Sequence, residues 1–351
     1  MRPVEIRRIG IGNFPTPFEE MPKLRRELGQ ECPKLYIKRD DLTGLALGGN
    51  KVRKLDYLLV EALRARADVI VTTCGIQSNW ARQTVASATK LGMKTVLILR
   101  TAQFKRPPRI YDGNLLLDHI LGAHVRFVQM RIDEDPALIL EQEANRLRKA
   151  GHRPYVLHVA SVESPPATVA YVQALFELMK QTKGAEIDWI VMATAGGGTQ
   201  AGLMLGAKLL KTRTKILGFN VGAFKRDMII QTIRESYKGA LELLGVTGHN
   251  LASEDIRVED GYIGAGYGFP TRKSLSAIKL VARSESIILD PVYTSKAIAG
   301  LVDLIKGGHF RKGENVCFLH TGGIPALFAY KEYFSPTSSR RLLSRTAIIT
   351  D

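Results

Sequence analysis

The sequence contains little cysteine and no histidine spacing typical of a metal site. Its 351 residues include three cysteines, Cys32, Cys74 and Cys317, and none of them forms a C-x-x-C pair. An odd number of isolated cysteines argues against a disulfide framework and a structural zinc site, and it favours a reducing compartment. The seven histidines form no H-x-x-x-H or H-E-x-x-H arrangement. We therefore expect no metal cofactor.

Long apolar runs are missing as well. No segment approaches the roughly 20 consecutive apolar residues that a membrane-spanning helix needs. The N-terminal stretch MRPVEIRRIGIGNFPTP carries charge but lacks the apolar region of a secretory signal. We expect a cytoplasmic protein without a membrane partner. Hydrophobic residues still make up 45% of the chain, which suffices for a sizeable core, and the length indicates about two domains.

The chain is strongly basic, with a net charge of +16 and a pI of about 9.8. Such a charge can attract nucleic acid or anionic small molecules. The lysines and arginines are spread along the chain, and no aromatic-basic RNA motif accompanies them. Nucleic-acid binding is therefore the less favoured interpretation. The compact basic stretch SPTSSRRLLSR near the C-terminus is more typical of an exposed segment than of a binding arm.

Short apolar segments alternate with amphipathic ones along most of the chain. The pattern predicts strands over 67–73, 95–99, 124–128, 155–158, 189–193, 215–221, 287–289 and 316–320. It predicts helices over 80–91, 113–121, 136–150, 164–181, 226–244 and 294–306, and a last helix from 324–325. This alternation is typical of an α/β fold with parallel-rich sheets flanked by helices. Such sheets bind ligands beyond the carboxyl ends of their strands.

Polar or glycine-rich turns follow several predicted strands, and TAGGGTQAG (194–202) is the most informative. Three consecutive glycines expose backbone N–H groups that can surround a phosphate, next to the positive end of a helix. The turn lacks the G-K-[ST] of a nucleoside-triphosphate loop. It also lacks the acidic residue that follows a dinucleotide-binding G-x-G-x-x-G by about 20 positions. The turn therefore predicts a phosphate site that holds neither of these nucleotides.

The stretch LALGGNKVRKL places Lys51 at the expected start of a helix, where a free cation is disfavoured. In CGIQSN, Ser78 either caps a helix or binds a carboxylate together with Asn79. A lysine, a carboxylate site and a phosphate cradle together indicate pyridoxal 5′-phosphate, whose aldehyde forms a Schiff base with a lysine amine. Lys54, one helical turn after Lys51, either faces the cofactor phosphate or is an ordinary exposed lysine.

On these motifs the chain resembles a known enzyme family. The stretches FPTPFEEMPKLRREL, LYIKRDDLTGLALGGNKVRKL and LHTGGIPALFAY are similar to the 1-aminocyclopropane-1-carboxylate deaminase and D-cysteine desulfhydrase family. This family belongs to the tryptophan-synthase-like, type II pyridoxal-phosphate enzymes. The resemblance covers nearly the whole chain except its C-terminal end. The ordered set GGNKVRKL, GIQSN-x-x-RQ and DPVY is specific to the group.

The resemblance implies roles for individual residues. Lys51 matches the Schiff-base lysine, and Asn79 matches the residue that bonds the cofactor's ring hydroxyl. Ser78 matches a serine that contacts the substrate and assists catalysis. The phosphate-binding elements match Lys54, Ala195, Gly196, Gly197, Gly198 and Thr199.

Two tyrosines and two threonines complete the comparison. Tyr267 and Tyr293 match the active-site tyrosines, although either could be a core aromatic, and Tyr262 competes with Tyr267. In the deaminases a glutamate that contacts the pyridine nitrogen stands where this chain has Thr294. In the deaminases a leucine precedes the paired glycines of the H-x-G-G stretch, where this chain has Thr321. Both threonines resemble the desulfhydrase branch. The chemistry agrees, because expelling a thiolate needs a weaker electron sink in the cofactor ring than opening a cyclopropane does.

We therefore expect β-elimination from D-cysteine, giving pyruvate, hydrosulfide and ammonia. Trp80 stands where relatives carry histidine or glutamine, and Cys74 where they carry glycine, so the substrate stays open. The alternatives are 1-aminocyclopropane-1-carboxylate deamination and a lyase for another β-substituted amino acid. A non-catalytic ligand binder and a nucleic-acid-binding protein are the non-enzyme alternatives.

The resemblance also implies an overall organisation. We expect a large domain from residues 1–53 and 163–351 and a small domain from residues 54–162. The cofactor would lie in the cleft between them, with the small amino-acid substrate, and the protein would form a homodimer.

Overall fold

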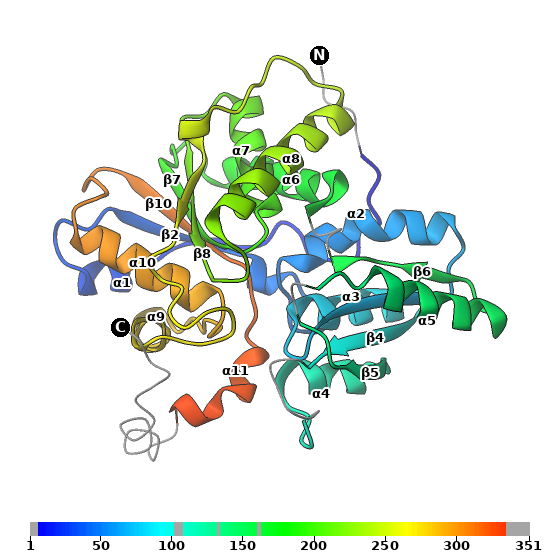
Figure 1. Ribbon diagram of the computed structural model, residues 1–351. Coiled ribbons are helices and arrows are strands. Elements are labelled where there is room, and N and C mark those ends of the chain that lie inside the picture. The colour runs from blue at the N-terminus through cyan, green and yellow to red at the C-terminus, as the bar shows by residue number, and fades with distance from the viewer. Residues whose placement is uncertain (1–5, 102–107, 132–133, 160–162, 335–351) are drawn as a thin grey trace.

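Two parallel-rich sheets organise the chain in the computed structural model, which describes residues 6–101, 108–131, 134–159 and 163–334 (Figure 1). The larger sheet has the strand order β1-β2-β10-β7-β8-β9. Its strands are β1 (Phe18–Glu20), β2 (Lys34–Arg39), β7 (Trp189–Thr194), β8 (Lys215–Asn220), β9 (Arg257–Glu259) and β10 (Asn315–His320). The smaller sheet has the order β5-β4-β3-β6. It consists of β3 (Val69–Gly75), β4 (Lys94–Arg100), β5 (His124–Val128) and β6 (Pro154–Val156).

Strand direction is parallel except at one edge. β1 runs antiparallel to β2, and the other pairings in the described part of the chain are parallel. The last strand, β10, lies between β2 and β7 and pairs with both of them. The carboxyl ends of the parallel strands in each sheet therefore meet at a common edge, as the α/β pattern predicts.

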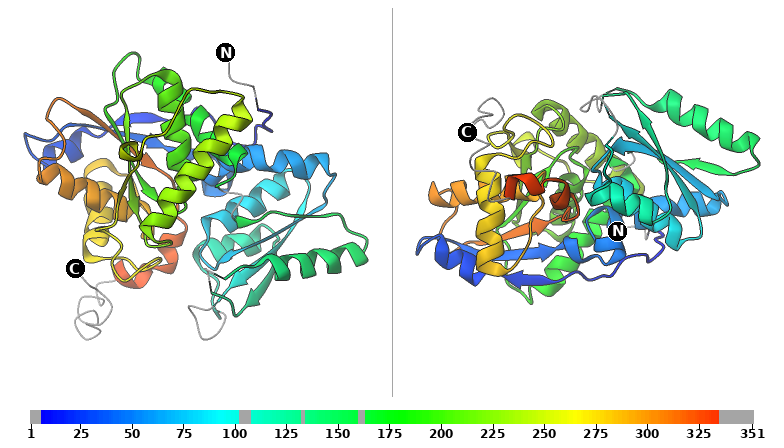
Figure 2. Two further views of the ribbon diagram at one scale, coloured as in Figure 1. Left: turned by 45° about the horizontal axis from the view of Figure 1, so that its top comes forward. Right: turned by 90° about the horizontal axis from the view of Figure 1, so that it is seen from below.

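Helices cover both faces of each sheet (Figure 2). The first six are α1 (Pro22–Glu27), α2 (Lys51–Arg64), α3 (Asn79–Lys90), α4 (Gly113–Ile120), α5 (Ala137–Lys149) and α6 (Pro165–Gln181). The others are α7 (Gly198–Leu210), α8 (Arg226–Leu244), α9 (Arg272–Glu285), α10 (Thr294–Lys306) and the short α11 (Ala326–Ala329). Sequence periodicity thus located most elements to within a residue or two.

Alternation along the central strands explains why they read as continuous apolar runs. In β7, Ile190 and Met192 pack with helices α6, α7 and α8. Their neighbours Val191 and Ala193 face the opposite core, formed with α9 and α10. A strand buried on both faces cannot place polar residues on either side, so it carries the apolar sequence typical of parallel sheets.

The strand expected over 287–289 is not formed. Ile287 and Leu289 are buried and Ile288 is exposed, so the segment does alternate in burial. However, the carbonyl oxygen of Ile288 accepts a hydrogen bond from Nε2 of His320 at 3.0 Å. Alternating burial predicts an extended chain. Here, however, the His320 side chain occupies the Ile288 carbonyl, which in a sheet would accept a hydrogen bond from a neighbouring strand.

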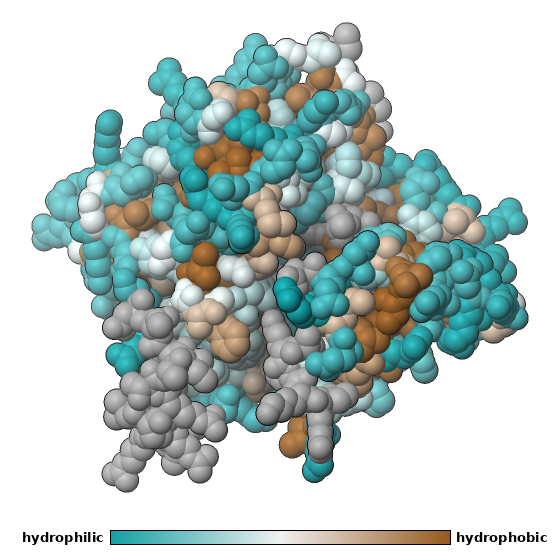
Figure 3. Space-filling model, viewed as in Figure 1, coloured by the Kyte–Doolittle hydropathy of each residue, from teal (hydrophilic) through white to brown (hydrophobic). Residues whose placement is uncertain are grey.

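The face of the molecule drawn in Figure 3 has no single dominant apolar region. None of the helices in the described ranges combines the length and hydropathy needed to cross a bilayer. Hydrophilic residues cover most of the face in Figure 3, and the hydrophobic ones lie in separate patches. The basic stretch SPTSSRRLLSR lies outside the described residues.

Helix α2 joins the two halves of the molecule. Its residues Val52, Leu55 and Leu59 pack into the core formed with the smaller sheet and α3. On another side of the same helix, Tyr57 packs into the core of the larger sheet. The first residue of α2 is Lys51, so the packing of this helix determines where the candidate Schiff-base lysine lies.

A buried network of charges anchors α2. Arg53 donates from Nη2 to Asp40 Oδ1 and to Glu177 Oε1, both at 2.8 Å. Lys38 donates to the same Glu177 oxygen at 2.5 Å, and the hydroxyl of Tyr171 donates to Asp40 Oδ2 at 2.7 Å. The network connects α2 to β2 and α6. Buried charges of this kind are tolerated because each is paired.

The pairing is visible in the pKa of Glu177. Burial opposes ionisation of this carboxyl, but hydrogen bonds and charge from Arg53 and Lys38 outweigh burial and lower its pKa to about 2. The unfolded-state pKa of a glutamate is about 4.3. The stabilisation is therefore fully present above about pH 4.3 and is lost as the pH falls toward the folded-state value.

We predict that Glu177→Gln lowers the free energy of unfolding at pH 7 by about 3 kcal/mol, because it removes the carboxylate paired with buried Lys38 and one of the two carboxylates paired with Arg53. Denaturant unfolding measures this difference, which should shrink as the pH is lowered from 4.3. Glu141→Gln is the control, since it breaks an exposed pair with Arg148 and should change stability by less than about 1 kcal/mol. Equal losses in both variants would contradict the network's role.

Candidate active site

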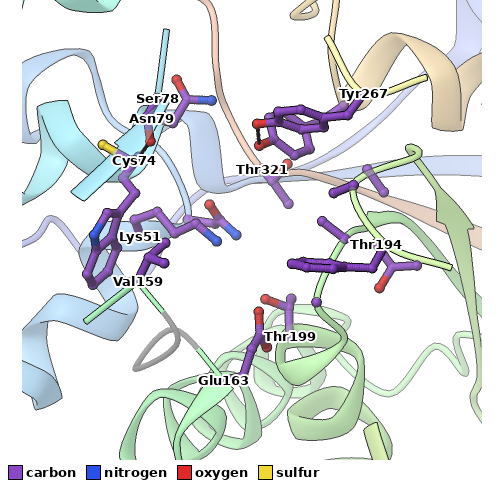
Figure 4. Close-up of a pocket in the computed structure, with 18 of the residues that line it drawn as sticks. Lys51, Cys74, Ser78, Asn79, Val159, Glu163, Thr194, Thr199, Tyr267 and Thr321 are labelled. Carbon is purple, nitrogen blue, oxygen red and sulfur yellow. Dashed lines mark hydrogen bonds between the residues drawn. The ribbon is translucent and has the colours of Figure 1, made fainter. Parts of the chain in front are cut away.

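A cavity of about 270 Å³ lies between the two sheets at the carboxyl ends of β3, β7 and β8. It brings together most of the site residues that were predicted from the sequence. Those that line it are Lys51, Ser78, Asn79, Trp80, Ala195, Gly196, Gly197, Thr199, Tyr267, Tyr293 and Thr321. Lys54, Gly198 and Thr294 are not among the lining residues. In Figure 4, Glu163 and Thr199 lie at one end of the pocket and Tyr267 lies at the other.

Two glycine turns pack against each other to place Lys51. Gly49 and Gly322 have positive φ angles of 130° and 88°. A Cβ atom on Gly322 would lie 2.7 Å from the Cα of Gly49, too close for any side chain. The backbone N–H of Asn50 donates to the carbonyl of Thr321 at 3.0 Å. The turns GGNK and HTGG therefore need glycine because their backbones touch.

The amine of Lys51 lies in a low-dielectric, positively charged environment. Burial, followed by the charge of Lys54, lowers its pKa to about 7, while Glu163 acts in the opposite direction. A lysine with this pKa carries a substantial neutral fraction at pH 7, unlike an ordinary lysine. The conflict between a cation and the positive end of α2 is thereby reduced, and a neutral amine is a nucleophile and a base.

Of the two roles that the sequence suggested for Ser78, the structure shows the helix cap. Its hydroxyl oxygen caps α3 by accepting N–H bonds from Trp80 at 3.2 Å and Ala81 at 3.4 Å. Because the oxygen is used as an acceptor, the hydroxyl proton is the part that can bind a ligand. Asn79 accepts a hydrogen bond from the amide of Asn114 at 3.0 Å, which orients its NH₂ group as the donor. The start of α3 is therefore suited to an anion.

Trp80 and Cys74 form part of the pocket wall. The indole N–H of Trp80 donates to the hydroxyl of Thr72 at 3.0 Å, which holds the buried ring in place. Burial, and then the charge of Asp118, raise the pKa of the Cys74 thiol to about 12. Both side chains are therefore uncharged at neutral pH, and they reduce the space beside Ser78 where glycine was expected at position 74.

The glycine-rich turn already binds an anionic group, the carboxylate of Glu163. The backbone N–H of Gly198, the first residue of α7, donates to Glu163 Oε2. A Cβ atom on Gly196 or Gly198 would collide with this carboxylate. Lys54 lies 3.9 Å from the same oxygen. The turn therefore holds an anion as a helix N-terminus does.

The donors around Glu163 match what a phosphate group requires. They combine backbone N–H groups at a helix N-terminus, the hydroxyl of Thr199 on the pocket wall and the ammonium of Lys54. Burial lowers the pKa of Lys54, and the nearby Glu163 carboxylate partly reverses this shift. A second anionic partner would stabilise its charged form further. The residues present therefore fit the phosphate of pyridoxal 5′-phosphate.

The two predicted active-site tyrosines contact each other. The hydroxyls of Tyr267 and Tyr293 share a hydrogen bond, and their rings are in edge contact with centroids 5.7 Å apart. Burial raises the pKa of Tyr267 to about 12, although its bond with Tyr293 lowers it. Burial also raises the pKa of Tyr293. Both hydroxyls therefore keep their protons at neutral pH. The competing Tyr262 instead donates to Asp303 at 3.1 Å.

The two threonines have different surroundings. Thr321 lines the pocket. Thr294 is fully buried, and its hydroxyl donates to Asp290 Oδ1 at 2.6 Å. The same carboxylate accepts backbone N–H bonds from Val292, Tyr293 and Thr294. Thr294 thus stabilises the turn that carries Tyr293.

Several residues of the pocket were not expected from the sequence. Glu163, Arg100, Val159 and Phe224 line it, yet none belongs to a glycine turn or a matching motif. Arg100 ends β4, and its guanidinium donates to Thr73 at 3.2 Å and to the carbonyl of Glu134 at 3.1 Å. The end of a predicted strand was the one available signal for Arg100, and no local signal distinguished Glu163.

Comparisons with known proteins agree with this chemistry. A family model described as pyridoxal-phosphate dependent enzyme matches residues 9–322. The chain is 38% identical to a D-cysteine desulfhydrase of Klebsiella pneumoniae, over 92% of this chain and 96% of that protein. It is 39% identical to a Pyrococcus furiosus protein with the provisional name 1-aminocyclopropane-1-carboxylate deaminase, over 92% and 94% of the two chains.

Solved structures give the same result. A crystal structure of an ACC deaminase homologue matches with a TM-score of 0.83 and 38% identity, covering 97% of this chain and 96% of the other. A tomato threonine deaminase isoform, 18% identical with a TM-score of 0.60 over 88% and 79% of the two chains, shares the fold. From the extent of the family match and the identity of its relatives, the chain belongs to the pyridoxal-phosphate dependent enzymes.

Proposed function

We propose that this enzyme is a lyase that eliminates hydrosulfide from D-cysteine, with pyruvate and ammonia as the other products. One observation carries the proposal. A single pocket joins a lysine amine of lowered pKa to a turn that binds an anion, and places Ser78 and a tyrosine pair beside them. The similarity to a D-cysteine desulfhydrase over nearly the whole chain supports the substrate.

Residues of this chain would bind three groups of the cofactor: its aldehyde, its phosphate and its ring hydroxyl. Lys51 would bind its aldehyde, and Lys54 and the turn from Ala195 to Thr199 would bind its phosphate. Asn79 would donate to the ring hydroxyl, and Thr321 offers a neutral hydroxyl on the pocket wall. When bound, pyridoxal 5′-phosphate supplies an electron sink for the bond that breaks at the substrate's α-carbon.

Binding of the substrate carboxylate would fall to the start of α3. The Ser78 hydroxyl and the Asn79 amide donate there, and the positive helix end adds a favourable potential. Trp80 would then lie next to the substrate side chain, and the buried indole excludes water from that side. A small thiol suits a wall whose nearby side chains are an indole and a second, protonated thiol.

Proton movements would use Lys51 and the tyrosine pair. The neutral amine of Lys51 would take the α-proton, since its pKa of about 7 makes the free base available near neutral pH. Tyr267 and Tyr293 would deliver a proton toward the departing sulfur, because both hydroxyls stay protonated. Overall, D-cysteine and water yield pyruvate, hydrogen sulfide and ammonia, so no oxidant or reductant is needed.

Deamination of 1-aminocyclopropane-1-carboxylate is the second candidate, supported by the Pyrococcus relative. The pocket argues against it. Glu163 is the carboxylate among the described lining residues, and it lies at the anion-binding turn. Thr294 replaces the glutamate that the deaminases place at the ring nitrogen, and its hydroxyl bonds Asp290. A strongly electron-withdrawing ring is therefore not favoured here.

We expect the purified, cofactor-loaded protein to release sulfide and pyruvate from D-cysteine and neither product from L-cysteine. Parallel assays with 1-aminocyclopropane-1-carboxylate should release no 2-oxobutanoate. Product formation from the cyclopropane alone would overturn the proposed substrate and restore the deaminase. Activity with neither compound would direct the search to other β-substituted amino acids that fit beside Trp80.

Lys51→Ala should abolish turnover and remove the visible absorbance band of protein-attached cofactor. The expected loss of activity is at least about 10⁴-fold, because this variant loses both the attachment point and the base. Lys180→Ala, at an exposed position of α6, is the control and should retain both properties. If the absorbance band and activity persist without Lys51, another lysine holds the cofactor.

Glu163 introduces competition into cofactor binding. Its carboxylate and a phosphate would use the same donors, the Gly198 N–H and the Lys54 ammonium. Two anions at these donors repel each other, so the carboxylate must move away from them when the phosphate binds. The charge of Glu163 therefore weakens anion binding at the turn.

We predict that Glu163→Gln binds inorganic phosphate and pyridoxal 5′-phosphate about tenfold more tightly than the wild type, since it removes about 1.4 kcal/mol of repulsion at nearly constant shape. Isothermal titration of the cofactor-free protein measures both affinities. Glu242→Gln, on exposed α8 surface, should leave them unchanged. Weaker binding by Glu163→Gln would indicate that this residue supports the phosphate site.

The larger organisation of the protein is also a proposal. The two sheets support a large domain of residues 1–53 and 163–351 and a small domain of residues 54–162. The proposed boundary falls within α2, which packs into both cores. We further propose a homodimer in the cytoplasm that acts on a small amino acid and does not bind nucleic acid. Light scattering of the purified protein would determine the assembly.

A further inference from the structure

Lys296 is a fully buried lysine that the proposed reaction does not use. It lies in the first turn of α10, three residues after Tyr293. Its ammonium donates to the carbonyl oxygens of Ile263 at 2.8 Å, Gly266 at 2.9 Å and Val221 at 3.2 Å. An ammonium has three N–H donors, so these acceptors satisfy it completely.

Each acceptor belongs to a segment that shapes the pocket. Val221 follows the last residue of β8 and precedes Ala223 and Phe224, which line the pocket. Ile263 and Gly266 lie in the segment that leads directly to Tyr267. Lys296 therefore connects the segment after β8 and the Tyr267 segment to the helix whose first turn follows Tyr293.

The Tyr267 segment needs such a connection because it is rich in glycine. Gly264, Gly266 and Gly268 have φ angles of 65°, 129° and 83°, all in the region that favours glycine. Segments of this kind have many accessible conformations, and ordering them costs conformational entropy. The segment also approaches its neighbour closely, since a Cβ atom on Gly222 would lie 2.7 Å from the Ile263 side chain.

The chemistry of the site requires a lysine. Three carbonyls that converge on one point create a negative potential that a compact ammonium with rotating donors can match. The planar guanidinium of arginine is larger and holds its donors in a fixed fork. Asp290 is the carboxylate whose charge acts on Lys296, and it favours the ammonium. Burial works the other way and lowers the pKa to about 8.

We propose that Lys296 is a positioning residue that holds the Tyr267 segment so that the hydroxyls of Tyr267 and Tyr293 meet. Its effect on turnover rests on the proposed function, in which this tyrosine pair serves the leaving group. Its effect on the segment does not depend on any reaction. Tyr330 holds the other end of the segment by donating to the carbonyl of Gly268 at 2.7 Å.

The test compares the cofactor-loaded wild type with Lys296→Met, which keeps the side-chain length but removes all three donors. Hydrogen–deuterium exchange, followed by mass spectrometry, should be at least about tenfold faster for amides of 261–268 in the variant. The matched control is Tyr237→Phe, which deletes a partly buried hydrogen bond to the carbonyl of His249 at 3.0 Å, between residues that do not line the pocket. The control should leave exchange in 261–268 unchanged.

Turnover of the amino-acid substrate gives the second readout. Lys296→Met should lower kcat about 100-fold with a smaller change in KM, because a reacting group displaced by about 1 Å can cost that factor. Combining it with Tyr267→Phe should give no further loss, since both changes remove the same group from the reaction. Multiplying losses would show a general structural effect and would overturn the positioning role.

Two further results decide the remaining cases. If Lys296→Met does not fold, Lys296→Gln keeps N–H donors at this position and should show the same localised exchange to a smaller degree. Unchanged exchange in 261–268 in either folded variant would overturn the proposal. If the wild type turns over no D-cysteine while exchange still changes in 261–268, the proposed function fails and the connection made by Lys296 stands.

Discussion

The ion network around Arg53 is the interaction on which the site depends. Arg53 lies between Lys51 and Lys54 in the sequence, so fixing its guanidinium against Asp40 and Glu177 also fixes the helical turn that presents both lysines. Removing one partner of a buried ion pair of this kind lowers the free energy of unfolding by several kcal/mol. The network therefore has one satisfactory geometry. A uniquely placed α2 follows, and with it a defined boundary between the two cores.

The pocket itself is governed by a balance of a few charges in a dry environment. Burial and the neighbouring charge of Lys54 lower the pKa of Lys51, while Glu163 partly restores it. The same glutamate uses the donors that a phosphate needs. Replacing the carboxylate by a phosphate brings a larger negative charge close to Lys54. The protonation of the two lysines and the binding of the cofactor are therefore coupled, and neither can be described without the other.

The sequence predicted most of the elements because they depend on local patterns, but it gave no prediction for β1, β2, β9, α1 and α9. Apolar runs and glycine turns located the strands, and the common edge of parallel strands brought Lys51, Ser78 and Thr199 together. It could not predict contacts between distant segments. Glu163 reaches Gly198, and Lys296 reaches Gly266, only after the helices have packed. Thr294 was expected at the cofactor but bonds Asp290, a neighbour that its own turn provides.

The position of β10 has a consequence for how the protein is made. This strand is near the end of the described chain, yet it lies between β2 and β7, which pair with each other only through it. During synthesis, β2 can pair with β1 at once, but its parallel partner β10 lies roughly 280 residues downstream. The turn beside Gly322 that supports Lys51 is completed at the same moment. A nascent chain can thus build the smaller sheet early, but it acquires a reactive lysine site only after β10 and the turn at Gly322 have been made.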